Sequence, residues 1–130
     1  MLGSAAAVGF GGFVGALARW GTAMMAAGTL GTRFAWGTLI ANLLGCFAMG
    51  CLRTVFDRTG IATPELTLAL MTGFLGAYTT FSAFSADTID LARSAGPRFA
   101  VAYVAVSVVG GVFLCWAGMR LAGSALATQG

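Results

Sequence analysis

Four long stretches of this 130-residue chain contain no charged residue. The length of these stretches restricts the possible folds more than any other feature of the sequence. The uncharged stretches cover residues 1–18, 34–52, 66–86 and 99–119. A bilayer core of about 30 Å needs roughly 20 apolar residues in a helix. Each stretch is long enough to span a membrane, the first by continuing past one arginine to about residue 27.

A composition of 58% hydrophobic and 8% charged residues excludes a water-soluble domain of this length. The sequence predicts an all-α integral membrane protein, a multi-pass protein with one membrane domain over residues 1–130. Thr63, Pro64 and Glu65 form an N-cap, a first-turn proline and an acid at the positive dipole end, which marks the start of the third helix. The four helices are expected at about 4–27, 34–56, 65–92 and 98–122.

Other classes of protein are disfavoured by the charges and the cysteines. The net charge of +3 comes from arginines near helix ends, which is usual for membrane proteins and does not indicate nucleic-acid binding. Cys46, Cys51 and Cys115 lie inside predicted spans, and the chain has no histidine. The cysteines therefore do not predict a metal or redox centre. Met1 to Ala7 has no basic residue, so a signal peptide is not expected.

Arginines are balanced between the two ends of the predicted bundle. An even number of crossings puts both termini on one side, with Arg53, Arg58 and Arg120, while Arg33, Arg93 and Arg98 lie on the other side. Orientation follows the Lys/Arg bias between loops, so three against three gives no strong preference. Insertion both ways round, and hence an antiparallel homodimer, is the expected result.

Small residues offer surfaces for close helix packing. Gly11 and Gly15 form a GxxxG pattern, and Gly73 and Ala77 a second pair of small residues. The sequence leaves open whether these pairs join two subunits or two helices of one subunit. Four helices leave little interior for a polar pathway, which favours an oligomer.

Polar side chains at membrane depth are costly, so they indicate function. On the second helix, Thr38 and Asn42 share one face, and Asn42 either lines a pathway or makes an interhelical hydrogen bond. Tyr103 and Ser107 share a face of the fourth helix. Arg19 either extends to the interface or keeps an anion vestibule positive.

The middle of the third helix, residues 73–85, contains two glycines and five hydroxyls. Glycine and Thr/Ser both weaken a regular helix, so we expect a break near its middle, with a continuous helix as the alternative. No acid falls in the middle of any span, whereas Phe81 and Phe84 present ring edges that carry partial positive charge. Donors without acids favour an anion as the transported species.

Three runs of residues resemble one known family, the Fluc (CrcB-type) fluoride channels. They are GGFVGALAR at 11–19, GTLIANLLG at 37–45 and GFLGAYTTFSAFS at 73–85. The third run is highly specific, and the resemblance covers essentially the whole chain. The resemblance implies a fluoride-selective passive channel rather than an enzyme. It implies export of cytoplasmic fluoride across the inner (plasma) membrane by a dual-topology antiparallel homodimer with two pores.

The resemblance also implies which residues act. Fluoride pore residues would be Asn42, Phe81, Phe84, Tyr103 and Ser107, with Thr38 and Thr79 as further polar contributors. A structural sodium ion would lie at the dimer interface, bound by backbone carbonyls of Gly76 and Thr79 that a break in the third helix would leave without intrahelical partners. The expected partners are a second copy of the chain, fluoride and membrane lipid, with no nucleic acid.

The sequence departs mildly from the family pattern, and two other classes are alternatives: a small exporter, and a non-transporting assembly protein, which would explain the glycines but not the central polar motif. Trp20 replaces a frequent Tyr, Ala83 replaces a frequent hydroxyl between the two Phe residues, and Gly111 gives no hydroxyl one turn beyond Ser107. These departures affect the detail of the polar track. A small multidrug-resistance-type exporter shares the size and the four helices but needs a membrane-embedded Glu, whereas Glu65 begins a helix.

Overall fold

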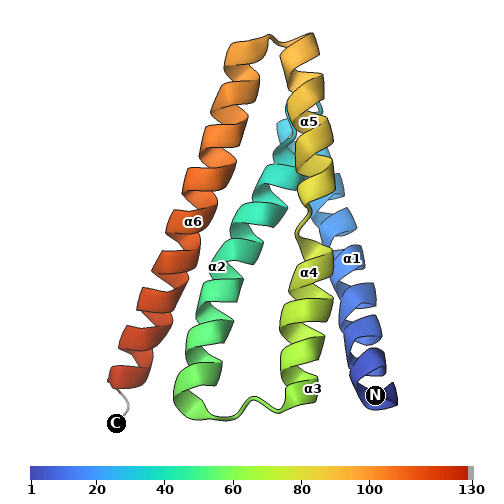
Figure 1. Cartoon of the computed structure of the whole chain (residues 1–130). Helices are drawn as coiled ribbons and strands as arrows, with labels where there is room; N and C mark the ends of the chain where they lie inside the picture. Colours follow the sequence, from blue (N-terminus) through green and yellow to red (C-terminus); the bar gives the residue numbers. More distant parts are fainter. Residues whose placement is uncertain (129–130) are drawn as a thin grey trace.

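The computed structural model describes residues 1–128 and contains four helical segments that are long and apolar enough to cross a membrane. This confirms the predicted all-helical, four-span architecture. Both termini lie at the same end, and the four segments run alternately up and down (Figure 1). The segments are Leu2–Leu30, Trp36–Thr59, Pro64–Ser94 and Pro97–Ala127.

Three of the four segments are single helices, and the third is composed of several pieces. The single helices are α1 (Leu2–Leu30), α2 (Trp36–Thr59) and α6 (Pro97–Ala127). The third segment consists of α3 (Pro64–Thr67), the wider π-helical η1 (Leu68–Leu75), α4 (Gly76–Tyr78) and α5 (Phe81–Ser94). Helix α2 continues to Thr59 rather than to about residue 56, because charged residues near an interface do not end a helix.

The start of the third segment follows from local sequence. The Thr63 side chain accepts a hydrogen bond from the Leu66 N–H at 3.1 Å, Pro64 occupies the first turn, and Glu65 places its acid there. These three features satisfy and complement the free N–H groups of a helix start. They confirm the predicted N-cap.

Between α4 and α5 the backbone is extended at two residues. Thr79 has φ −85° and ψ 159°, and Thr80 has φ −153° and ψ 122°. Gly76, which the sequence suggested as a source of weakness, has ordinary helical dihedrals. The α5 helix then begins with the Thr80 side chain accepting from the Ala83 N–H at 3.2 Å.

Glycines let helices of the same chain touch backbone to backbone. A Cβ on Gly11 or Gly15 of α1 would overlap the backbone of Ala69 or Phe74 in η1, and one on Gly73 would meet Val8 O at 2.6 Å. Likewise, a Cβ on Gly50 of α2 would overlap the backbone of Cys115 in α6. The small-residue pairs at residues 11, 15 and 73 therefore pack helices within one subunit, the alternative that the sequence left open.

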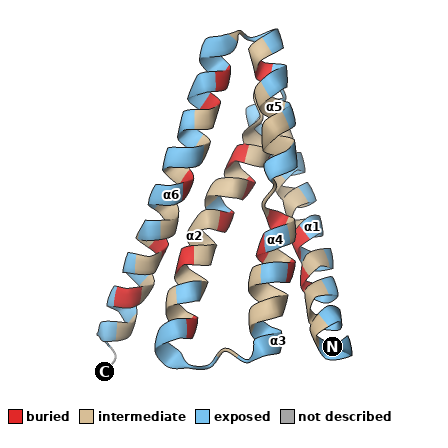
Figure 2. Cartoon of the chain, viewed as in Figure 1, coloured by how far each residue is buried: buried red, intermediate tan, exposed pale blue. Residues whose placement is uncertain are grey.

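Buried residues form thin strips on the inward sides of the helices, while most outward positions are exposed (Figure 2). Exposed large hydrophobic side chains occur on every span, among them Phe10, Met25, Val112 and Trp116. Such a surface suits lipid or another protein rather than water. One buried cluster, comprising Leu39, Leu91, Ala100 and Tyr103, joins α2, α5 and α6 beyond the extended residues.

Candidate functional site

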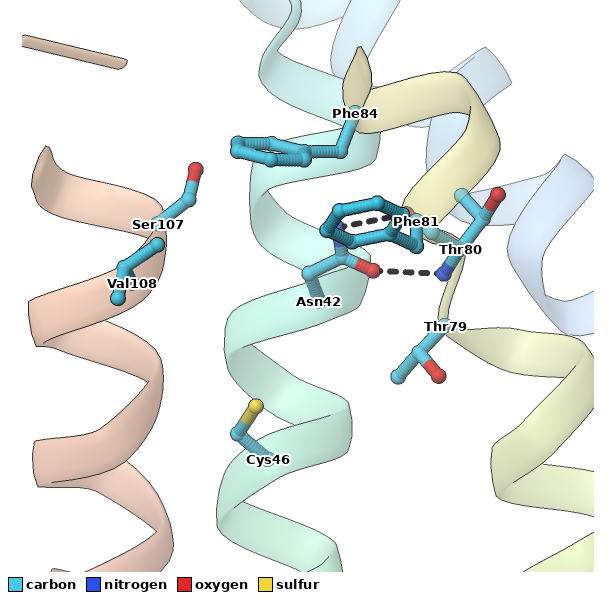
Figure 3. A pocket seen from close by; sticks show the side chains of 8 residues that line it. All are labelled: Asn42, Cys46, Thr79, Thr80, Phe81, Phe84, Ser107 and Val108. Carbon is cyan, nitrogen blue, oxygen red and sulfur yellow. Dashed lines mark hydrogen bonds between the residues drawn. The ribbon is translucent and has the colours of Figure 1, made fainter. Parts of the chain in front are cut away.

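A cavity of about 260 Å³ lies where α2 and α6 face the extended residues of the third segment (Figure 3). Five of the seven residues expected in the pore line it, namely Asn42, Thr79, Phe81, Phe84 and Ser107. Three further residues that the sequence did not indicate complete its wall, namely Cys46, Thr80 and Val108. Tyr103 and Thr38 do not line this cavity.

The amide of Asn42 binds both backbone groups of one extended residue. The Thr80 N–H donates to Asn42 Oδ1 at 2.8 Å, and Asn42 Nδ2 donates to the Thr80 carbonyl at 3.1 Å (Figure 3). In an extended residue the N–H and C=O point to the same side, as they do toward a neighbouring strand. The side chain of Asn42 therefore satisfies groups that an unbroken helix would have satisfied itself.

Aromatic rings continue from the cavity toward α6. The Phe81 and Phe84 ring centroids are 5.6 Å apart with a tilt of 44°, and the Phe84 and Tyr103 centroids are 5.4 Å apart. Phe84 is half-buried, while Phe81 is 80% exposed. Tilted rings place edges, which carry partial positive charge, beside the cavity. Phe81 therefore presents a large apolar surface that other parts of this chain do not cover.

Two hydroxyl groups of the cavity wall differ in availability. Ser107 Oγ is buried and has no hydrogen-bond partner within the described part of the chain. An unpaired buried hydroxyl is costly, so this one is ready to bind a polar ligand. Thr79 Oγ1 instead donates to the Leu75 carbonyl at 2.9 Å. As placed, Thr79 offers an acceptor rather than a donor to the cavity.

Tyr103 lies beyond the cavity, where it is 1% exposed and packs against Phe84. Its hydroxyl donates to Asp87 Oδ2 at 3.4 Å. Sequence reasoning missed Asp87, the first charge after the third uncharged stretch, because its contact with Tyr103 depends on how α5 and α6 pack. Asp87 also lines a small polar cavity of about 210 Å³ with Arg33, Asp90 and others at that end of the bundle.

Arg19 and Thr38 lie together in a separate cavity of about 590 Å³. Its lining includes Trp20, Ser82 and Thr80, the last of which also lines the cavity that holds Asn42. Thr80 therefore lies between the two cavities. The larger cavity gathers one guanidinium and several hydroxyls, which is a composition that attracts anions.

The carbonyls of Gly76 and Thr79 lose the amides that an unbroken helix would supply four residues later. For Gly76 that amide is Thr80 N–H, which donates to Asn42 Oδ1. For Thr79 it is Ala83 N–H, which donates to Thr80 Oγ1. Both carbonyl oxygens can therefore accept from another partner, and neutral oxygens of this kind suit a hard cation.

The known proteins to which this chain is similar come from one family. The family model described as CrcB-like protein, Camphor Resistance (CrcB), matches residues 6–119. The chain is 42% identical over 121 residues to a protein of Pseudomonas putida named Fluoride-specific ion channel FluC, covering 93% of this chain and 98% of the relative.

Two further relatives carry the same name, which is that of an ion channel and not of an enzyme. One from Stutzerimonas stutzeri is 43% identical over 122 residues, covering 94% of this chain and 98% of the relative. One from Chlorobium phaeobacteroides is 41% identical over 115 residues, covering 88% and 89%. The chain is a multi-pass membrane protein and belongs to the CrcB-like family.

Proposed function

We propose that this protein is a fluoride-selective passive ion channel. The observation that carries the proposal is the cavity between α2, α5 and α6, which joins an amide, two phenylalanine rings and the unpaired Ser107 hydroxyl. None of its eight lining residues is an acid. The names of the relatives identify fluoride as their ion, and the cavity chemistry suits a small anion.

Fluoride is small and strongly hydrated, so a narrow path must replace its water with hydrogen-bond donors. Asn42 Nδ2–H, Ser107 O–H and the ring edges of Phe81 and Phe84 can take that role. A path built this way selects by size and by donor spacing, as other filters do. Tyr103 continues the polar track toward Asp87, to which its hydroxyl donates, and the cavity with Arg19 and Thr38 serves as an approach vestibule.

We further propose an antiparallel homodimer with two pores in the inner membrane. Three arginines at each end give no orientation bias, and Phe81, at 80% exposure, leaves one side of the cavity without a wall. A second copy would supply that wall. Flow would be outward, because a membrane potential contributes roughly 2.3 kcal/mol per charge per 100 mV to the expulsion of an anion.

A sodium ion at the subunit interface is the third part of the proposal. The carbonyls of Gly76 and Thr79 support it, since the N–H groups that would bind them in a helix donate elsewhere. Two such oxygens from each subunit would provide four around a two-fold axis. Bound sodium would offset the desolvation of these carbonyls.

Fluoride efflux from liposomes tests the main proposal. Purified protein is reconstituted into vesicles loaded with potassium fluoride or potassium chloride, and efflux is started with a potassium ionophore. We expect rapid fluoride release, chloride release close to that of empty vesicles, and no dependence on a proton gradient. Equal release of both anions would contradict selectivity, and release that requires a proton gradient would contradict a passive channel.

Topology is tested by adding two or three lysines to one terminus, which biases insertion. Activity should fall, and co-expression with an oppositely biased copy should restore it. A terminal tag accessible from one side only in the unmodified protein would exclude dual topology.

Sodium is tested by exhaustive dialysis against a large organic cation. We expect weaker dimers and slower fluoride flux, both restored by sodium and not by the organic cation. Unchanged dimer stability and flux would remove the ion from the proposal.

A further inference from the structure

The side-chain amide of Asn42 makes its hydrogen bonds to the backbone of Thr80 rather than to a group in the cavity. Its Oδ1 accepts from Thr80 N–H, and one of its two amide hydrogens goes to Thr80 C=O. These two bonds close a ring between the side-chain amide and one extended residue. In such a ring, the amide hydrogen on the same side as Oδ1 is the one that bonds to the Thr80 carbonyl. The second amide hydrogen of Asn42 is then free to bind a ligand.

Thr80 is the point from which both phenylalanine rings are positioned. The α5 helix starts at Phe81, directly after Thr80, and the Thr80 side chain caps it through the Ala83 N–H. The direction in which α5 leaves the extended pair therefore depends on the Thr80 backbone. Phe81 and Phe84 lie in the first turn of that helix, so their placement depends on the same residue.

We propose that Asn42 is a positioning residue, whose side chain holds Thr80 extended and thereby fixes the Phe81 and Phe84 rings. The proposal rests on the function proposed above and gives Asn42 a role that precedes anion binding. Without the amide, two backbone groups at membrane depth lose their partners, and each such loss is costly. The segment then relaxes toward a continuous helix, which turns Phe81 and Phe84 away from the cavity.

Hydrogen exchange of the Thr80 backbone amide measures this contact directly. Protein labelled with ¹⁵N-threonine is followed by NMR in lipid nanodiscs without fluoride, and the Thr80 signal is assigned with Thr80→Ser. In Asn42→Ala we expect the Thr80 amide to exchange with deuterium at least tenfold faster and its resonance to shift. Leu44→Ala, a change at an exposed position of α2, serves as the control and should leave the Thr80 amide unchanged.

Asn42→Asp provides a rescue by protonation. A neutral carboxylic acid has one donor and one acceptor, as the amide contact requires, whereas the ionised form has two acceptors facing the Thr80 carbonyl. Between about pH 7.5 and about pH 5, the Thr80 protection of Asn42→Asp should rise, whereas fluoride flux should recover less, because the acid has no second donor for the anion. Cys46 is the other titratable residue of the cavity wall, and Asp87 lies behind Tyr103. The unmodified protein is therefore measured over the same range, with empty vesicles as the leak control.

The outcomes separate this proposal from the channel function. Wild-type exchange of the Thr80 amide in Asn42→Ala would overturn the positioning role, even with flux lost. Thr80 protection that stays low in Asn42→Asp at about pH 5 would overturn it as well, because a neutral acid supplies the same donor and acceptor to the Thr80 backbone as the amide does. Absence of fluoride efflux in the unmodified protein would overturn the channel function while leaving the Thr80 measurement valid.

Discussion

Two regions of this protein pack their helices in opposite ways. Where α1 meets η1 and where α2 meets α6 below the cavity, glycines bring backbones into contact and leave no space. Around Thr79 and Thr80 the helix gives way, and side chains of α2, α5 and α6 enclose a cavity instead. The first arrangement makes a rigid frame, and the second makes room for an ion.

The two regions also differ in how they satisfy the backbone. In the glycine contacts every helix keeps its own hydrogen bonds, and packing comes from dispersion between close surfaces. At the extended pair, side chains replace the helical partners, as Asn42 does for Thr80. Substitutions at the glycine contacts should therefore destabilise the fold strongly, whereas those near the extended pair should alter conduction in a protein that still folds.

The largest effect is expected from Gly11→Ala. A Cβ there would overlap the Ala69 carbonyl and approach Phe74 N at 3.0 Å, and backbone atoms cannot rotate away. The cost should reach about 3 kcal/mol or more, since α1 must separate from η1. Thermal unfolding in detergent and the yield of dispersed protein measure it.

Gly9→Ala is the matched control on the same helix, because no atom outside its own helical turn lies within 4 Å of a Cβ at Gly9. Alanine is the better helix former by about 1 kcal/mol, so this variant should be neutral or slightly stabilised. Equal losses in both variants would mean that the glycine contact between α1 and η1 does not hold the frame together.

A second prediction concerns the two rings. Phe81→Ile and Phe84→Ile should each reduce fluoride flux by at least tenfold, because an aliphatic group has no positively polarised edge. Phe84→Ile should also lower stability by about 1 kcal/mol, since half-buried Phe84 packs against both Tyr103 and Phe81, whereas exposed Phe81 has only its contact with Phe84 to lose. Liposome efflux and thermal unfolding are measured together, and normal flux in both variants would exclude the rings from the path.

The membrane spans could be predicted from the sequence because they depend on a local property, namely the length of an uncharged stretch compared with the thickness of the bilayer. The family resemblance also grouped Asn42, Phe81, Phe84 and Ser107 in one pore. The sequence could not show that Asn42 binds the Thr80 backbone, because the two are 38 residues apart and the contact depends on how α2 is aligned with the third segment. For the same reason it could not tell whether the glycines or the hydroxyl residues would leave the helix; Gly76 is helical, and Thr79 and Thr80 are extended.

Asp87→Asn should produce a moderate gain. The carboxylate accepts the Tyr103 hydroxyl, and its negative charge opposes an anion at that end of the path. Removing the charge while keeping an acceptor should raise fluoride flux roughly two- to fivefold, more at low than at high salt. Asp90→Asn removes an equal charge from the same polar cavity. An equal gain in both variants would show that the Tyr103 contact is irrelevant.

The smallest effect is expected at the frame's outer edge, where Arg58 Nη1 donates to the Gly123 carbonyl at 3.1 Å and joins α2 to α6. Arg58 is exposed, so solvent competes for the bond, and Arg58→Ala should cost only about 0.5 kcal/mol with flux unchanged. Arg53→Ala is the appropriate control, because it removes a charge from the same end of the bundle and alters any orientation bias equally. The difference in melting temperature between the two variants, expected at roughly 2 °C, isolates the bond to Gly123. If Arg58→Ala instead reduced flux while Arg53→Ala did not, the frame and the path would be coupled at this end, and the separation between the two regions would fail there.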